Sequence, residues 1–181
     1  MPVFYFYFKY QDPARDSFVT LARALIGQAA IKDHTVLSHI YNEQLKSPEK
    51  PLSSFKFSSN ILVSVLKSFN SACIILDGLD ECKYEEIEKI GSWFMKFVRS
   101  AHDATLNIRC LFSSQNDSCT NKIFKAAPSL ALSASNIAVD LRIYCGAKAT
   151  EVQEKFRLDD ENKEKIIEKV LAESKGDFIQ N

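Results

Sequence analysis

The chain of 181 residues is poor in the features that mark several protein classes. Its five cysteines are odd in number and show no CxxC spacing, which argues against a disulfide framework and favours reduced thiols in a cytosolic protein. Its three histidines are scattered and give no metal-site spacing. The 23 basic residues balance the 23 acidic residues, so no net charge attracts nucleic acid or an anionic membrane surface.

Long apolar runs are also missing from the sequence. No stretch approaches the roughly 20 residues that span a bilayer, and no secretory signal opens the chain. The five adjacent aromatics at residues 4–8 can in principle stack bases, but only Lys9 lies nearby to supply positive charge, so core packing is the better interpretation. We therefore expect a soluble, cytoplasmic protein that binds neither nucleic acid nor membrane.

Glycine is scarce, and the glycines do not form a phosphate-binding loop. Such a loop requires the pattern GxxxxGK[ST] after a strand, because its backbone N–H groups cradle the phosphates and its lysine reaches the terminal ones. None of the glycines begins this pattern; they are Gly27, Gly78, Gly91, Gly146 and Gly176. The sequence therefore predicts no triphosphate cradle of this kind.

The most informative segment is 73–82, where an apolar run stops on three carboxylates grouped around one glycine. The run 74–76 predicts a strand covered on both faces, and Asp77 follows where that strand leaves the sheet. Ligands of open α/β sheets collect at such carboxyl ends. We expect Asp77 to hold Mg²⁺, and Asp80 or Glu81 to orient or deprotonate a water. The alternative is a strand that ends in a solvated acidic turn.

Strands and helices alternate along the chain, which predicts an α/β fold with a doubly wound, mostly parallel sheet. Asp12 followed by Pro13 predicts the start of the first helix, prolines between residues 47 and 51 end the second, and Gly176 ends the last. Strands are expected at residues 3–8, 74–77, 107–112 and, more weakly, 129–135. Helices are expected at residues 12–29, 36–45, 61–69, 84–100, 121–127, 140–156 and 161–175.

The order of these segments resembles a fungal NACHT domain, and most closely the nephrocystin-type N-terminal NACHT module. The resemblance covers nearly the whole chain. It rests on the aromatic strand, on KYQDPARDSF at residues 9–18, on the leucine-rich helix, on ILDGLDEC at residues 75–82, on LFSSQ at residues 111–115, and on C-terminal runs at residues 140–143, 156–158 and 174–178.

This resemblance implies a signal-transduction NTPase of the STAND class with a P-loop NTPase fold. In that class, ATP or GTP bound with Mg²⁺ switches a multidomain protein between closed and oligomeric states. Asp77 matches the Walker B acid near Mg²⁺. Asp80 and Glu81 match the acids that follow the small residue, for which the resemblance implies catalytic roles.

The resemblance also implies a sensor segment and the absence of the N-terminal Walker A region. Ser113, Ser114 and Gln115 match the sensor segment, which contacts bound nucleotide. The family usually has arginine where this chain has Gln115, and a neutral amide cannot make a charge-assisted phosphate contact. The Walker A strand, loop and helix belong upstream of the aromatic strand, so we expect the domain to be N-terminally truncated and followed by C-terminal helices.

We therefore expect residues 1–145 to form a partial NACHT nucleotide-binding core and residues 146–181 to begin a helical region. Two functions stay open. In the first, the chain is a fragment of a NACHT NTPase that carries the Walker B and sensor strands but does not bind nucleotide tightly or hydrolyse it alone. In the second, it is a non-enzymatic α/β interaction module that associates with itself or with NACHT-type proteins through its exposed edge and helices.

Overall fold

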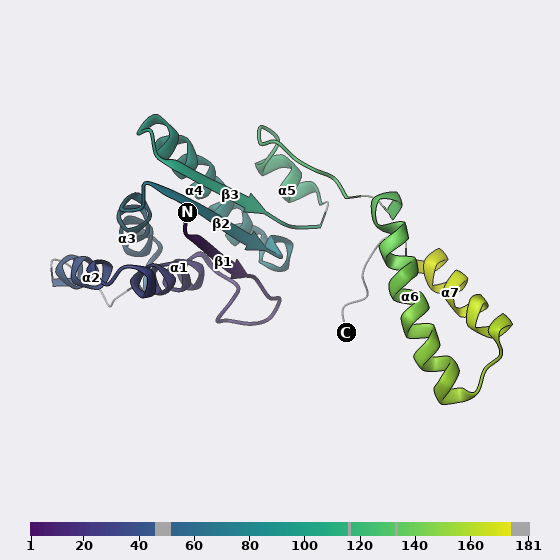
Figure 1. Ribbon diagram of the computed structural model, residues 1–181. Coiled ribbons are helices and arrows are strands. Elements are labelled where there is room, and N and C mark those ends of the chain that lie inside the picture. The colour runs from purple at the N-terminus through teal and green to yellow at the C-terminus, as the bar shows by residue number, and fades with distance from the viewer. Residues whose placement is uncertain (46–51, 116, 133, 175–181) are drawn as a thin grey trace. The chain divides into compact units, whose positions relative to one another are not determined.

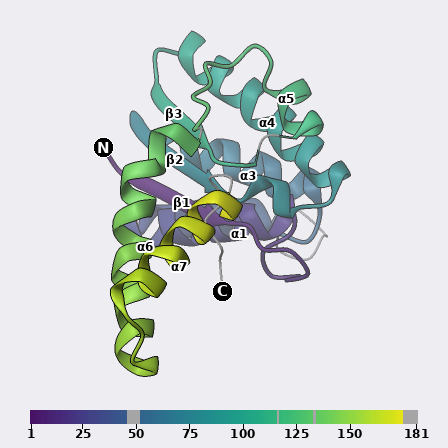
Figure 2. The ribbon, with the colours of Figure 1, turned by 90° about the vertical axis from the view of Figure 1, so that its right-hand side faces the viewer.

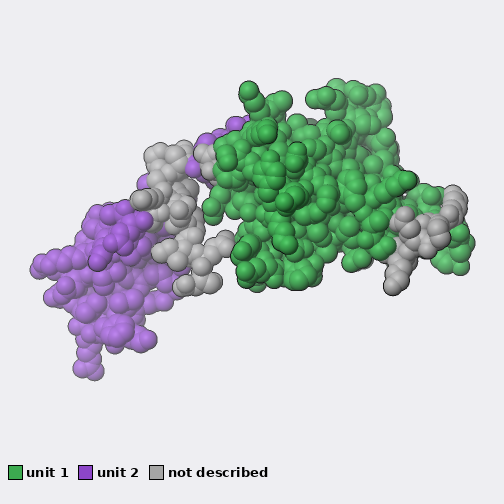
Figure 3. All heavy atoms as spheres, turned by 180° about the vertical axis from the view of Figure 1, so that it is seen from behind, with its two compact units in different colours: residues 1–127 green, residues 128–181 purple. Residues whose placement is uncertain are grey.

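The computed structural model describes residues 1–45, 52–115, 117–132 and 134–174. The chain divides into two compact units, residues 1–127 and 128–181, which are shown in different colours in Figure 3. Unit 1 contains β1 (Val3–Tyr7), α1 (Phe18–Lys32), α2 (Thr35–Leu45), α3 (Phe55–Lys67), β2 (Ser71–Asp77), the 3₁₀ turn η1 (Leu79–Glu81), α4 (Tyr84–Asp103), β3 (Asn107–Phe112) and α5 (Ser118–Ile123) (Figure 1). Unit 2 contains α6 (Ala134–Phe156) and α7 (Asp160–Ser174).

The strands form a parallel three-stranded sheet in the order β1–β2–β3. Tyr7 pairs with Asp77, and Leu76 pairs with Phe112, at the ends of their ladders. Because the strands are parallel, their carboxyl ends lie along one edge of the sheet. The structure thus confirms an α/β fold with a parallel sheet and places the acidic end of β2 between the ends of its neighbours.

One face of the sheet builds the hydrophobic core of unit 1. Phe4 and Ile74 are completely buried on this face, and Ile108 is nearly so. Residues of α1, α3 and α4 belong to the same buried cluster, and Figure 2 shows these helices on one side of the sheet. Phe94 of α4, for example, is fully buried in it. Amphipathic helices on an apolar sheet face account for the stability of this unit.

The opposite face of the sheet is exposed and carries mostly apolar side chains, with Asp77 and Arg109 among them. Alternate residues of a strand point to opposite faces, so the aromatic run of β1 divides into buried phenylalanines and exposed tyrosines. Among the described residues of unit 1, helices pack on one face only, whereas the sequence predicts a doubly wound sheet with helices on both. The exposed fractions on this open face are Val3 43%, Tyr5 51%, Tyr7 53% and Leu111 58%.

Helix α1 begins at Phe18, later than the sequence predicts. The Ser17 side chain accepts a hydrogen bond from the Thr20 N–H, and the Thr20 side chain accepts one from the Ser17 N–H, which forms a capping box. Asp12 does not start the helix, because its carboxylate pairs at 2.8 Å with Arg15 inside the preceding loop. The predicted start at Asp12 and Pro13 is therefore wrong.

Two further predictions near unit 2 are wrong. Helix α5 lies at Ser118–Ile123, not at 121–127, because the Asp117 carboxylate accepts hydrogen bonds from the first N–H groups of that helix. The strand predicted at 129–135 does not form: residues 129–132 have no regular structure, and α6 already begins at Ala134. The helix ends predicted from the prolines at 47–51 and from Gly176 lie outside the described residues.

Unit 2 is a helical hairpin. Leu141, Cys145 and Ala149 of α6 are spaced four residues apart and form a small buried cluster with Ile167 of α7. Arg142 pairs with the carboxylates of two glutamates of α7, but all three side chains are more than half exposed, so these ion pairs add little stability. The domain limit predicted at residue 145 falls inside α6.

Substitution of two helical glycines by alanine will change stability in opposite directions. A Cβ at Gly91 of α4 would lie 2.6 Å from Ile123 Cγ2, so Gly91→Ala should destabilise the protein through overpacking, which costs about 1–3 kcal/mol. Gly27 of α1 has open space at this position, so Gly27→Ala should stabilise it by about 0.5–1 kcal/mol. Urea unfolding measures both changes, and a stabilising Gly91→Ala would contradict the packing of α5 on α4.

Candidate functional site

The predicted acidic residues lie in one turn at the carboxyl end of β2. Asp77 is the last residue of the strand, and Gly78 follows with φ +72° in the left-handed region that favours glycine. Leu79, which is fully buried, anchors the 3₁₀ turn η1 in the core. The chain therefore changes direction directly after Asp77 and carries Asp80 and Glu81 along the end of the sheet.

The turn is bonded to the end of β3. The N–H groups of Gly78 and Leu79 donate to the carbonyl oxygen of Ser113 at 3.0 and 3.2 Å. The Asp80 carboxylate accepts a hydrogen bond from the N–H of Gln115 at 3.0 Å. The structure thus brings the acidic turn and the polar end of β3 together, as expected for two strand ends at one sheet edge.

Glu81 is bonded in the other direction, to the loop between β1 and α1. Its Oε2 accepts a hydrogen bond from the N–H of Tyr10 at 2.7 Å. The Phe8 N–H donates to the carbonyl oxygen of Asp77 at 2.9 Å, so the two segments also meet through their backbones. Asp80 and Glu81 therefore each accept a backbone N–H, a contact that the sequence pattern does not reveal.

Asp77 differs from these two acids. No described residue forms a hydrogen bond or ion pair with its half-buried carboxylate. Within the described part of the chain, no group of three or more histidines, cysteines, aspartates and glutamates is placed to hold a metal ion. Mg²⁺ is commonly bound through one or two carboxylates, waters and substrate phosphates, so the single carboxylate of Asp77 fits one position of such a shell.

The predicted sensor residues are exposed and polar. Ser113 uses its backbone to bind the acidic turn, and the Ser114 hydroxyl donates to the Gln115 carbonyl oxygen at 3.1 Å. The Gln115 N–H is engaged by Asp80, which fixes the backbone at the end of this segment. These side chains add hydroxyl and amide groups to the edge that carries Asp77, but no positive charge.

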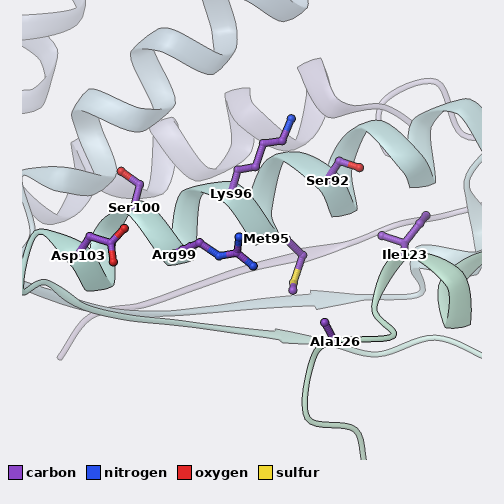
Figure 4. Close-up of a pocket in the computed structure, with 8 residues that line it drawn as sticks. All are labelled: Ser92, Met95, Lys96, Arg99, Ser100, Asp103, Ile123 and Ala126. Atoms are coloured by element: carbon purple, nitrogen blue, oxygen red, sulfur yellow. The ribbon is translucent and has the colours of Figure 1, made fainter.

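A separate pocket of about 440 Å³ lies on α4 beside α5, away from the predicted site residues (Figure 4). Met95, Arg99 and Ile123 are among the residues that line it, and none of the predicted acidic or sensor residues does so. The pocket residues of α4 recur at helical spacing. In the sequence, this spacing looks the same as that of any amphipathic helix. The pocket was therefore not predictable as a site.

Cys82 directly follows the acidic turn but is not a nucleophile. Burial, together with the nearby carboxylates of Asp16 and Glu86, raises the pKa of its thiol to about 12. All five cysteines are free, in agreement with the expectation of reduced thiols. Cys82 therefore serves as a small apolar side chain beneath the turn.

The fold and the site define a class of protein, an α/β domain whose parallel sheet ends in an acidic turn tied to the next strand. The model of the family "Nephrocystin 3, N-terminal" matches residues 1–115, and the chain belongs to this family, which is a NACHT-like region. The match includes the whole sheet and all predicted site residues. No curated protein and no solved structure matches the chain. The described helices include none with the length and apolar character needed to cross a bilayer.

Cys82 should resist alkylation in the folded protein. With a pKa of about 12, about one thiol in 10⁴ is ionised at pH 8, and the buried sulfur is also shielded from reagent. We expect mass spectrometry to find Cys82 unmodified after iodoacetamide treatment at pH 8 and modified once urea unfolds the chain. Equal rates of modification in both conditions would contradict the burial of this thiol.

Proposed function

We propose that the chain carries the metal-binding and nucleotide-sensing edge of a NACHT-type signal-transduction NTPase. The observation that carries this proposal is the hydrogen-bonded junction between the acidic turn after β2 and the end of β3, in a chain of the nephrocystin 3 N-terminal family. Nucleotides bind to open α/β sheets at this carboxyl edge. In this function, Asp77 is the Walker B acid and residues 113–115 are the sensor.

Asp77 is the residue suited to Mg²⁺. Its carboxylate is a hard oxygen ligand at the strand end, and no described side chain competes for it. A bound Mg²⁺ supplies positive charge that offsets the charge of phosphate groups. The hydroxyl of Ser113 lies on the exposed end of the neighbouring strand, where it is able to donate a hydrogen bond to a phosphate oxygen, whereas the Ser114 hydroxyl already donates to the Gln115 carbonyl oxygen.

The same residues predict weak binding of nucleotide. The sequence contains no GxxxxGK[ST] loop, and Gln115 supplies no charge where arginine would. The edge itself carries Asp77, Asp80 and Glu81, which repel a triphosphate unless a cation intervenes. We therefore propose that this chain alone neither binds ATP or GTP tightly nor hydrolyses them.

Titration of the chain with fluorescent ATP and GTP analogues in the presence of Mg²⁺ tests this function. We expect no saturable binding tighter than about 1 mM, which corresponds to about 4 kcal/mol of binding free energy, and no change on Asp77→Asn. Glu85→Gln is a control, since Glu85 is an exposed acid in the first turn of α4. Micromolar binding would contradict the proposal that the chain alone does not bind nucleotide tightly. If Asp77→Asn abolished that binding and Glu85→Gln preserved it, the site would be assigned to Asp77.

A second function, a protein-interaction module, is favoured by the open face and edge of the sheet. On the outer edge of β1, Gln28 bonds both the N–H and the carbonyl oxygen of Tyr5, at 3.0 and 2.7 Å, and so closes that edge. On the other side of the sheet, β3 is an edge strand that pairs with β2 alone among the described strands. Exposed strand edges and apolar faces of this kind are frequent sites of association.

Under this second function, a charge on the open sheet face should weaken association. Leu111 is 58% exposed on that face, and Leu37 of α2 is 54% exposed elsewhere, so Leu111→Lys and Leu37→Lys form a matched pair. We expect Leu111→Lys to reduce co-purification with an intact NACHT-type protein, or self-association in light scattering, at least about tenfold, and Leu37→Lys to change neither. Equal behaviour of the two variants would exclude this face.

A further inference from the structure

The contacts of Glu81 point to a role that differs from the catalytic one implied by its sequence position. We propose that Glu81 is a positioning residue that holds the loop between β1 and α1 against the carboxyl edge of the sheet. This proposal rests on the proposed function in one respect: the loop flanks the carboxyl edge of the sheet, where the nucleotide is proposed to bind. Its basis is the 2.7 Å hydrogen bond from the Tyr10 N–H to Glu81 Oε2, which joins residues 71 positions apart.

The base from which Glu81 reaches the loop is rigid. The η1 turn is closed by the Glu81 N–H, which donates to the Gly78 carbonyl oxygen at 2.9 Å. It is attached to β3 through the N–H groups of Gly78 and Leu79, and the Leu79 side chain is fully buried. Because the turn is held by β3 and by the core, the backbone of Glu81 has a fixed position from which its carboxylate reaches the loop.

The Glu81 side chain folds back over the turn toward Gly78. A Cβ at Gly78 would lie 3.6 Å from Glu81 Oε1 and 3.8 Å from its Cγ. One carboxylate oxygen of Glu81 therefore packs near Gly78, while the other accepts the Tyr10 N–H. The latter oxygen binds a backbone N–H, as a structural acceptor does.

The loop that Glu81 holds is a folded unit in itself. The Lys9 N–H donates to the Arg15 carbonyl oxygen at 3.0 Å, and the Arg15 N–H donates to the Asp12 carbonyl oxygen at 2.8 Å. The hydrogen bond from the Arg15 side chain lowers the pKa of Asp12, so this pair stays charged at neutral pH. Since residues 9–15 are joined internally, one bond at Tyr10 positions the whole loop.

Three substitutions separate a positioning role from a role as a base. Glu81→Gln removes the charge but keeps an acceptor oxygen at the same reach, so it should preserve the bond to Tyr10. Glu81→Asp keeps the charge but is shorter by one methylene, and Glu81→Ala has no acceptor, so both should lose it. A general base requires the carboxylate itself, so it would lose its function in Glu81→Gln, the variant that keeps the bond to Tyr10.

Amide hydrogen exchange at Tyr10, followed by NMR in the full chain, measures the bond directly. We expect exchange to rise at least about tenfold in Glu81→Ala and Glu81→Asp, which lose the bond. In Glu81→Gln it should rise by only a few-fold, because the neutral amide oxygen still accepts the bond and only its charge-assisted part is lost. Trypsin cleavage of the Lys9–Tyr10 bond should accelerate in the same two variants. Asp80→Ala is the matched control, because it should expose the Gln115 N–H and leave Tyr10 protected.

The proposal is overturned if Tyr10 exchanges at the wild-type rate in Glu81→Ala, or if Glu81→Gln loses protection as fully as Glu81→Ala. Urea unfolding of each variant identifies any general loss of stability, and the comparison of Glu81→Gln with Glu81→Asp remains decisive even if Glu81→Ala does not fold. No nucleotide is present in these measurements. Their outcome is therefore independent of the titration that tests the proposed function.

Discussion

The parallel pairing of β2 with both neighbours is the constraint on which the rest of this structure depends. It places the end of each strand at one sheet edge, and only there can the turn after Asp77 donate its N–H groups to Ser113. With that turn fixed, Asp80 reaches the end of β3 and Glu81 reaches the loop after β1. The site is thus a junction of three segments that are distant in sequence.

Much of the fold was predictable because its signals are local. The apolar run before Asp77, the helical spacing in α4 and the alternation in β3 each determine an element without reference to the remainder of the chain. The start of α1 was not predictable from local signals. Asp12 forms an ion pair inside the preceding loop, and the Phe18 N–H donates a hydrogen bond to Glu86 of α4. The predicted strand at 129–135 failed because a strand requires a neighbour to pair with.

The candidate site was predictable in its location but not in its contacts. The sequence places Asp77 at the strand end, whereas the partners of Asp80 and Glu81 are backbone N–H groups 35 and 71 positions away. The open sheet face was equally hidden, because aromatic residues at nearly every position of β1 indicate a strand that is buried on both faces. The acid-rich turn therefore holds the loop after β1 and the end of β3, while the carboxylate of Asp77 has no hydrogen-bond partner among the described residues.

The central claim is that the acidic turn is attached to β3 through Gly78 and Leu79, and native-state hydrogen exchange at these two amides tests it most directly. The account predicts that both exchange as slowly as the Ser113 amide, which bonds to Leu76, because turn and sheet edge open together. Exchange at Gly78 and Leu79 as fast as in an unstructured peptide, with Ser113 still protected, would show that the turn is free of the sheet and would contradict the account.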